Sequence, residues 1–193
     1  MDRSWTLITL SVVDSTNTFL KEFARLHPEK DKVIVRAAFQ SEGRGKGSSK
    51  WISEKGGFYF SVLDRNISIT HLSLYSLWII YIASLVMKSY DIPVKIKKPN
   101  DLYLNGKKLA GALVESSIQG EKLEWSIAGL GININNTFPE KYMFTSLLDY
   151  KKSTYNIDEI YGKLLELWIE KRTEWMEQKA DYFQKEIEGI YLI

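Results

Sequence analysis

A glycine-rich loop in the first third of the chain carries the residue types needed to bind an anion. It reads Gly43-Arg44-Gly45-Lys46-Gly47-Ser48-Ser49-Lys50-Trp51. Glycines at alternate positions allow backbone N–H groups to approach a ligand closely, and the cations between them favour a carboxylate or phosphate. The loop is neither a Walker A loop nor a dinucleotide fingerprint, because its spacing is wrong and a strand is expected after it. On composition alone, a solvent-exposed hairpin loop is the commoner interpretation.

A second cluster of polar residues lies around a predicted hairpin in the middle of the chain. It comprises Lys97-Lys98-Pro99-Asn100-Asp101 and Lys107-Lys108-Leu109-Ala110-Gly111. Lysines beside a hairpin usually face solvent, and Asn-Asp after proline usually makes a turn. Lys108, however, opens an apolar strand next to small residues. A cation in that position has room to contact a substrate carboxylate or an α-phosphate.

Two further segments have both a structural and a functional interpretation. Residues 129–135 read Gly-Leu-Gly-Ile-Asn-Ile-Asn, which is either a strand narrowed by glycine for close packing or a strand that places Asn133 beside a nucleotide. Residues 14–17 read Asp-Ser-Thr-Asn, and Asp14 or Ser15 can cap a helix there. Capping and ligand binding can coexist, since a helix N-terminus favours anions.

The remaining composition excludes several kinds of site. The 193 residues include no cysteine and only two histidines, His27 and His71, so disulfides, thiolate-held metals and a cysteine nucleophile are excluded. Neither histidine has a partner at metal-ligand or triad spacing. The formal net charge of +2 gives no large basic field, so nucleic-acid or membrane-surface binding is not expected. We expect a cytoplasmic protein, because the sequence begins without a signal-peptide pattern and lacks cysteine.

The elements that position these residues follow from hydrophobic periodicity and turn signals. Strands are predicted at Trp5–Val13, Lys32–Gln40, Phe58–Leu63, Val94–Lys97, Asp101–Leu104, Lys107–Ser117 and Leu123–Ile134. Helical spacing follows Asp14 up to Pro28 and recurs from Ile157 to Ile187. The uncharged run His71–Met87 is shorter than the roughly 20 residues of a membrane span, so it is predicted to be a buried core helix. Asn105-Gly106 is a strong hairpin signal. Together these predict an α+β domain, with a mixed or antiparallel sheet and helices packed on one side.

Taken in order, five motifs resemble biotin protein ligase, in its monofunctional form without a DNA-binding domain. The family's Ser-Thr-Asn corresponds to Ser15–Asn17, and its Gln-x-x-Gly-Arg-Gly-Arg loop closing on Lys-Trp corresponds to Gln40–Lys46 and Lys50-Trp51. Its Lys-Trp-Pro-Asn-Asp, Lys-Leu-Ala-Gly-Ile-Leu-Val-Glu and Gly-x-Gly-Ile-Asn motifs correspond to residues 97–101, 108–115 and 129–133. The resemblance covers about two-thirds of the chain. It implies a class II synthetase-like biotin/lipoate ligase catalytic domain over residues 1–193, without an N-terminal helix-turn-helix and with an absent or truncated C-terminal β-barrel.

The resemblance also implies a reaction and a set of site residues. Biotin would attack the α-phosphorus of ATP·Mg²⁺ to give biotinyl-5′-AMP, and a lysine of a biotin carboxyl carrier domain would then accept the biotinyl group. The catalytic residues would be Lys108 and Arg44. Biotin would be bound by Ser15, Thr16, Asn17, Gln40, Gly43, Arg44, Gly45, Lys46, Lys108 and Gly111. ATP and Mg²⁺ would be bound by Lys46, Trp51, Asn100, Asp101 and Asn133, with the metal held through the phosphates rather than by a dedicated protein site.

Two positions depart from the family pattern. Lys46 stands where the family usually has arginine, and Lys98 stands where it has tryptophan. Because lysine lacks the bidentate fork of arginine, we predict that this loop retains the adenylate less tightly than an arginine loop. Two alternatives stay open: a lipoate–protein ligase or lipoyl/octanoyl transferase, and a non-catalytic biotin-binding module. The carrier protein and the oligomeric state, including a homodimer, are also left open.

Overall fold

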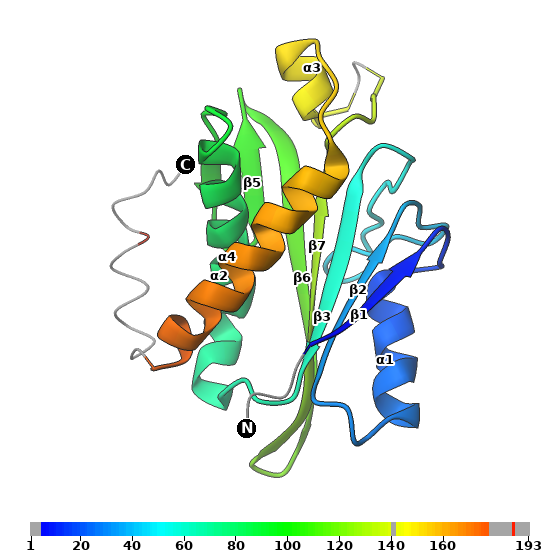
Figure 1. Ribbon diagram of the computed structural model, residues 1–193, viewed down its shortest axis with the longest axis vertical. Coiled ribbons are helices and arrows are strands. Elements are labelled where there is room, and N and C mark those ends of the chain that lie inside the picture. Colours follow the sequence, from blue (N-terminus) through cyan, green and yellow to red (C-terminus); the bar gives the residue numbers. More distant parts are fainter. Residues whose placement is uncertain (1–4, 140–141, 178–186, 188–193) are drawn as a thin grey trace.

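A seven-stranded mixed sheet forms the centre of the molecule (Figure 1). The structure, a computed structural model, describes residues 5–139, 142–177 and 187. The strand order is β1-β2-β3-β7-β6-β5-β4; β1 is parallel to β2, and every other neighbouring pair is antiparallel. The strands are β1 (Thr6–Leu10), β2 (Lys32–Ala37), β3 (Phe58–Asp64), β4 (Lys95–Lys97), β5 (Asp101–Leu104), β6 (Lys107–Gln119) and β7 (Lys122–Ile132).

The helices cover both faces of this sheet. Helices α2 (Ile69–Lys88) and α4 (Ile157–Glu177) pack together on one face, whereas α1 (Thr16–Leu26) lies on the opposite face (Figure 1). The α+β class and the mixed sheet are confirmed, but the expectation that the helices share one side is wrong. The physical reason is the β1–α1–β2 unit: parallel strands need a crossover, and its handedness sends α1 to the face that α2 and α4 do not occupy.

The two faces differ in the size of the core that they bury. The larger cluster joins α2 and α4 to the sheet, and its most deeply buried large side chains include Trp78, Trp168 and Phe60. The smaller cluster lies under α1 and contains Leu20, Val33 and four other buried residues. By length and composition α2 could cross a membrane, but it packs between the sheet and α4. The prediction of a core helix is therefore confirmed.

Most of the predicted element boundaries hold to within a few residues. The first predicted helix begins at the Ser15 cap, whose Oγ accepts a hydrogen bond from the Thr18 N–H, and the Asn105-Gly106 turn joins β5 to β6. Helix α3 (Leu147–Lys151) was not predicted, because a single short turn carries no periodicity. The last predicted helix is described as far as Glu177; residues 178–186 of that prediction lie outside the described residues.

Candidate ligand-binding site

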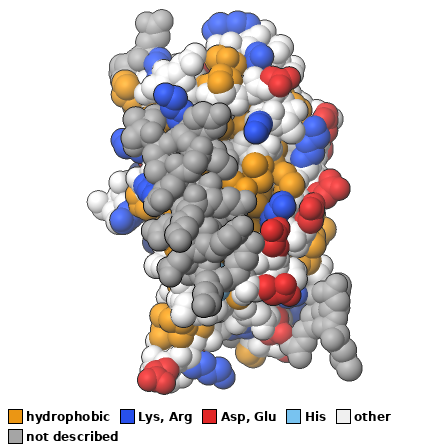
Figure 2. Space-filling model, turned by 90° about the vertical axis from the view of Figure 1, so that its left-hand side faces the viewer, with side chains coloured by type: hydrophobic (Ala, Val, Ile, Leu, Met, Phe, Trp, Pro, Cys, Tyr) orange, Lys and Arg blue, Asp and Glu red, His pale blue; other side chains and the backbone are white. Residues whose placement is uncertain are grey.

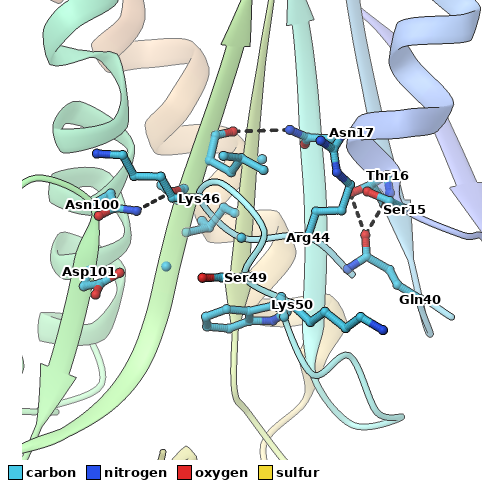
Figure 3. A pocket seen from close by; sticks show the side chains of 18 of the residues that line it. Ser15, Thr16, Asn17, Gln40, Arg44, Lys46, Ser49, Lys50, Asn100 and Asp101 are labelled. Atoms are coloured by element: carbon cyan, nitrogen blue, oxygen red, sulfur yellow. Dashed lines mark hydrogen bonds between the residues drawn. The ribbon is translucent and has the colours of Figure 1, made fainter. Parts of the chain in front are cut away.

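A cavity of about 410 Å³ opens where the N-terminus of α1, the glycine-rich loop and strands β6 and β7 meet. Figure 3 shows side chains from these separate segments turned toward a common space. Twelve of the fourteen predicted site residues line this cavity: Ser15, Thr16, Asn17, Gln40, Arg44, Gly45, Lys46, Trp51, Asn100, Asp101, Lys108 and Gly111. The tertiary structure therefore brings together predicted residues from four parts of the chain, 15–17, 40–51, 100–101 and 108–111.

The glycine-rich loop is an ordered hairpin. The Gly45 N–H donates to the Ser49 carbonyl at 2.8 Å, and the Trp51 N–H donates to the Gly43 carbonyl at 2.9 Å. Gly47 has φ of +65° at the turn, a conformation that glycine adopts without steric cost. In Figure 3, Arg44 extends from this hairpin toward Asn17 and Lys46 extends toward Asn100. The loop thus carries Arg44 and Lys46 to opposite ends of the cavity.

One end of the cavity is a network of buried hydroxyl and amide groups. The Thr16 N–H and Oγ1 both donate to the Gln40 side-chain oxygen, at 2.8 and 3.0 Å. The Gln40 amide in turn donates to Ser53 Oγ at 2.8 Å. Ser61 Oγ lies 2.7 Å from both Thr16 Oγ1 and Asn17 Oδ1. Because these groups hold one another in fixed orientations, the site presents a preorganised polar surface to a ligand.

The Glu115 carboxylate ties three segments together beside this network. It accepts hydrogen bonds from Asn17 Nδ2 at 2.9 Å and from Lys21 Nζ at 2.6 Å, and it lies 3.2 Å from Arg44 Nη1. Burial by itself raises the pKa of Glu115, but the hydrogen bonds from Lys21 and Asn17 and the charges of Lys21 and Arg44 outweigh it. The net pKa is therefore lowered. Glu115 stays ionised at neutral pH and anchors both α1 and the loop.

At the other end, Lys108 is placed between a carboxylate and an aromatic ring. Its Nζ lies 2.6 Å from Asp101 Oδ1 and 5.3 Å from the centroid of the Trp51 ring. Glycines make this packing possible: a Cβ at Gly131 would lie 2.5 Å from Trp51 Nε1, and one at Gly111 would lie 3.0 Å from Trp51 Cζ3. The Trp51 indole and the end of the Lys108 side chain therefore occupy space that side chains at these two glycine positions would otherwise fill.

Two predicted site residues do not line the cavity. Gly43, at the start of the loop, packs against Ser53, and a Cβ there would lie 2.3 Å from Ser53 Oγ. Asn133 is 1% exposed, and its amide donates to the Thr145 carbonyl at 3.0 Å. The prediction of a direct contact between Asn133 and a nucleotide therefore needs correction. Its side chain is used inside the protein, where it fixes the segment that carries Phe144.

Several residues of the site were missed by the sequence reasoning. Glu115 could have been found from strand alternation, since it lies on the same face of β6 as Gly111 and Leu113. Phe144 had no local signal. It reaches the cavity because its backbone forms a bridge with Lys108, and its ring centroid lies 6.5 Å from that of Trp51. The other lining residues outside the predicted set are Ser49, Lys50, Ala112, Leu113, Gly129, Leu130 and Gly131.

The charges of the lining residues define the chemistry that the cavity can support. Arg44, Lys46, Lys50 and Lys108 face a single lining carboxylate, Asp101. An excess of cations in a concave site stabilises anionic ligands and the charge that develops during phosphoryl or acyl transfer. The fixed polar network at the opposite end suits a neutral head group with donors and acceptors. The cavity is therefore matched to an elongated ligand with one polar end and one anionic end.

Sequence comparison places this cavity in a known context. Residues 9–133 match the Biotin/lipoate A/B protein ligase family. The chain is 32% identical over 141 residues to the bifunctional ligase/repressor BirA of Bacillus subtilis, covering 70% of this chain and 43% of that protein. It is 28% identical over 172 residues to the biotin–protein ligase of Schizosaccharomyces pombe, covering 78% of this chain and 27% of that protein. The chain thus spans less than half the length of either relative.

Solved structures agree on the fold. Biotin protein ligase from Aquifex aeolicus, in complex with biotin and ATP, superposes with a TM-score of 0.76 at 30% identity, covering 94% of this chain and 76% of that one. A Plasmodium falciparum protein in complex with lipoate superposes with a TM-score of 0.62 at 11% identity, covering 91% of this chain and 64% of that one. The second likeness shows the fold alone.

Proposed function

Because the chain belongs to the Biotin/lipoate A/B protein ligase family, we propose that it is an ATP-dependent biotin protein ligase. The observation that carries the proposal is a cavity lined by residues from each of the five motifs. Of the predicted site residues, only Gly43 and Asn133 do not line it. The Schizosaccharomyces pombe and Aquifex aeolicus proteins, which are named as biotin protein ligases, support the same activity. The proposal extends to the carrier, the lysine of a biotin carboxyl carrier domain, and to a cytoplasmic location.

The polar end of the cavity favours biotin over lipoate. Biotin carries a ureido ring with two N–H donors and one carbonyl acceptor, whereas the far ends of lipoate and octanoate carry no such groups. Thr16, Asn17 and Gln40 are buried polar residues at this end of the cavity. These side chains can offer hydrogen-bond partners to the ureido group, and the apolar end of lipoate or octanoate cannot use them. Lipoate or octanoate transfer therefore remains the second candidate function.

In the first step, the site aligns two substrates and neutralises charge rather than supplying a nucleophile. The biotin carboxylate attacks the α-phosphorus of ATP, pyrophosphate leaves, and the mixed anhydride biotinyl-5′-AMP forms. Lys108 is placed to offset the charge on the carboxylate and the α-phosphate, and Arg44 closes the biotin end of the loop. Trp51 and Phe144 provide an aromatic wall for the adenine. Orientation and fixed positive charge supply the rate enhancement in such a site.

In the second step, the amine of the carrier lysine attacks the acyl carbonyl and AMP leaves. The reaction also requires Mg²⁺, which shields the triphosphate charge when bound. Among the described residues, acidic and histidine side chains form no group of three or more that could hold a metal. We therefore propose that the ion enters with ATP and is held mainly by its phosphates, with Asp101 and Asn100 nearest to it.

ATP–pyrophosphate exchange with biotin, lipoate and octanoate in parallel tests the proposal. We expect biotin to stimulate exchange and the other two acids to leave it near the background. Exchange stimulated by lipoate alone would reverse the choice of acid. Tight biotin binding without any exchange would indicate a non-catalytic binding module instead. Addition of a carrier domain should then convert the adenylate into a stable amide on its lysine.

A further inference from the structure

We propose that Ser61, on strand β3, is a positioning residue that sets the selectivity of the polar end of the cavity. Ser61 belongs to none of the five motifs and does not line the cavity. It acts instead through Thr16 and Asn17, which do line it. The inference deepens the proposed function and rests on it, because the ligand that this end must recognise is the ureido ring of biotin.

Ser61 lies against the first turn of α1, at a point where the sheet leaves room for the contact. It is fully buried and pairs with Gly129 of β7. A Cβ at Gly129 would lie 2.2 Å from Asn17 Oδ1 and 3.3 Å from Ser61 Oγ. Because Gly129 has no side chain, the Asn17 oxygen can reach the Ser61 hydroxyl across the strand pair.

The Ser61 hydroxyl has one proton and two neighbouring acceptors. Its Oγ lies 2.7 Å from Thr16 Oγ1 and 2.7 Å from Asn17 Oδ1. The Thr16 hydroxyl proton is directed to the Gln40 side-chain oxygen, at 3.0 Å, and an amide oxygen such as Asn17 Oδ1 only accepts. The Ser61 proton therefore serves one of the two acceptors at a time. The other acceptor is left without a donor from the residues that the structure describes.

Neighbouring groups prevent the two amides from turning over to supply the missing proton. Asn17 Nδ2 donates to Glu115 Oε2 at 2.9 Å, and a flipped amide would place its oxygen against that carboxylate. Gln40 Nε2 donates to Ser53 Oγ at 2.8 Å, while the Gln40 oxygen accepts from the Thr16 N–H. A flipped Gln40 would set its NH₂ group against that N–H. The missing donor must therefore come from the ligand.

This arrangement selects a ligand whose far end carries an N–H group. Charge does not separate biotin from lipoate and octanoate, because each carries one carboxylate; basic and acidic side chains in any case both occur on the face of the molecule drawn in Figure 2. A ureido N–H can donate to the acceptor that Ser61 leaves open, whereas the other two acids have no such donor. A buried acceptor without a donor lowers affinity. Ser61 thus makes the polar end depend on the ureido group.

Biotin-dependent ATP–pyrophosphate exchange by Ser61→Ala, together with isothermal titration calorimetry of biotin, tests the proposal. Without the hydroxyl, Thr16 Oγ1 and Asn17 Oδ1 lose the proton that holds them together, and we expect the KM and Kd for biotin to rise by about tenfold. The KM for ATP and the kcat at saturating biotin should stay at the parent values, because the reacting end of the cavity is unchanged. Ser61→Cys, which fills the space with a weaker donor, should show the same selective loss to a smaller degree.

Ser126→Ala is the matched control. Ser126 is also a fully buried serine of the sheet, but its Oγ donates to the Asp64 carbonyl at 2.6 Å, and it does not line the cavity. Both alanine variants should lose some stability toward urea, whereas only Ser61→Ala should lose affinity for biotin. In an Asn17→Ala background the effect of Ser61→Ala on biotin binding should shrink, because Ser61 acts partly through Asn17.

The outcomes separate this inference from the proposed ligase activity. An unchanged KM for biotin in Ser61→Ala, or an equal rise in Ser126→Ala, would overturn the role of Ser61 and leave the ligase activity standing. A rise of the same size in the KM for ATP would overturn it too, since that is the result of a general structural defect. If the parent chain shows no exchange, the ligase proposal fails, and calorimetry with biotin still decides the role of Ser61. A parent chain that does not bind biotin would overturn both.

Discussion

The two faces of strands β6 and β7 differ in how their side chains are used. On the face toward α2 and α4, β7 presents Ala128, Leu130 and Ile132 to the large core cluster. On the opposite face, the alternate positions Gly129 and Gly131 have no side chain, and Asn17 and Trp51 occupy the space that a Cβ would take. Side chains of β7 therefore fill the space on the side toward α2 and α4, which we call the filled face. The opposite side, where the glycines leave room for Asn17 and Trp51, is called the open face.

This difference separates stability from ligand binding along one backbone. The filled face buries the aromatic side chains that hold α2 and α4 to the sheet, and burial of that kind contributes most of the folding free energy. The open face buries polar groups that pay for their desolvation by bonding to one another. Substitutions on the first face should therefore act mainly on stability, and those on the second mainly on ligand turnover.

The largest expected effect is on the filled face. Trp168 is fully buried, and its ring centroid lies 4.8 Å from that of Trp78 and 5.5 Å from that of Phe60. Trp168→Ala should lower the free energy of unfolding by about 3–5 kcal/mol, because it removes a large buried ring and leaves a cavity. Urea denaturation measures the change. A urea midpoint equal to that of the parent would contradict the conclusion that the filled face supplies most of the stability.

Lys108→Ala should have the largest effect on turnover from the open face. Loss of a fixed charge beside the reacting carboxylate and α-phosphate should reduce the rate of adenylate formation by about 10²–10³-fold. The unfolding midpoint should change little. Lys107→Ala is the matched control, since Lys107 is adjacent in sequence but does not line the cavity. Equal exchange rates in the two variants would contradict the role assigned to Lys108.

Gly129→Ala tests whether the open face requires an absent side chain. The new Cβ would lie 2.2 Å from Asn17 Oδ1, so Asn17 must move and its contact with Ser61 must break. We expect biotin binding to weaken by about tenfold, the value of one lost hydrogen bond, as measured by isothermal titration calorimetry. In Gly162→Ala on α4, a Cβ meets nothing within 4 Å, and this control should be slightly stabilised. Unchanged binding in Gly129→Ala would show that the cavity tolerates the side chain.

Glu115→Gln should reveal a pH-dependent contribution of the Glu115 carboxylate to the free energy of unfolding. The folded pKa of Glu115 is lowered below the ordinary value of 4.5, so its ionised form stabilises the fold above that value. The contribution is lost as the pH falls through the folded pKa. The difference in unfolding free energy between parent and variant should thus be largest at neutral pH and shrink below about pH 4.5. Glu121→Gln, at an exposed turn, is the control and should show no such trend.

The smallest expected effect is at the loop. Lys46→Arg should slow release of biotinyl-5′-AMP by about fivefold, because a guanidinium can make two charge-assisted hydrogen bonds where an ammonium makes one. Stopped-flow dilution measures the rate. Equal release rates would show that the loop backbone, rather than the side chain, retains the adenylate.

Much of the fold and most of the site followed from local sequence patterns. The Ser15 cap, the Asn105-Gly106 hairpin and the alternation along β7 are encoded by residues close to one another in the chain. Twelve of the fourteen candidate site residues were found because they belong to contiguous motifs. The sequence alone therefore determined which residues could bind a ligand and which family they resemble.

Only the tertiary structure decided how those residues are used. It placed α1 on the face opposite α2 and α4, turned Asn133 inward, brought Phe144 to the cavity and paired Glu115 with Asn17 and Lys21 of α1. These outcomes depend on contacts between residues far apart in sequence, such as Lys21 with Glu115 and Lys108 with Phe144. Local periodicity shows which side of a strand or helix is apolar. The packing of the whole chain decides what each side meets.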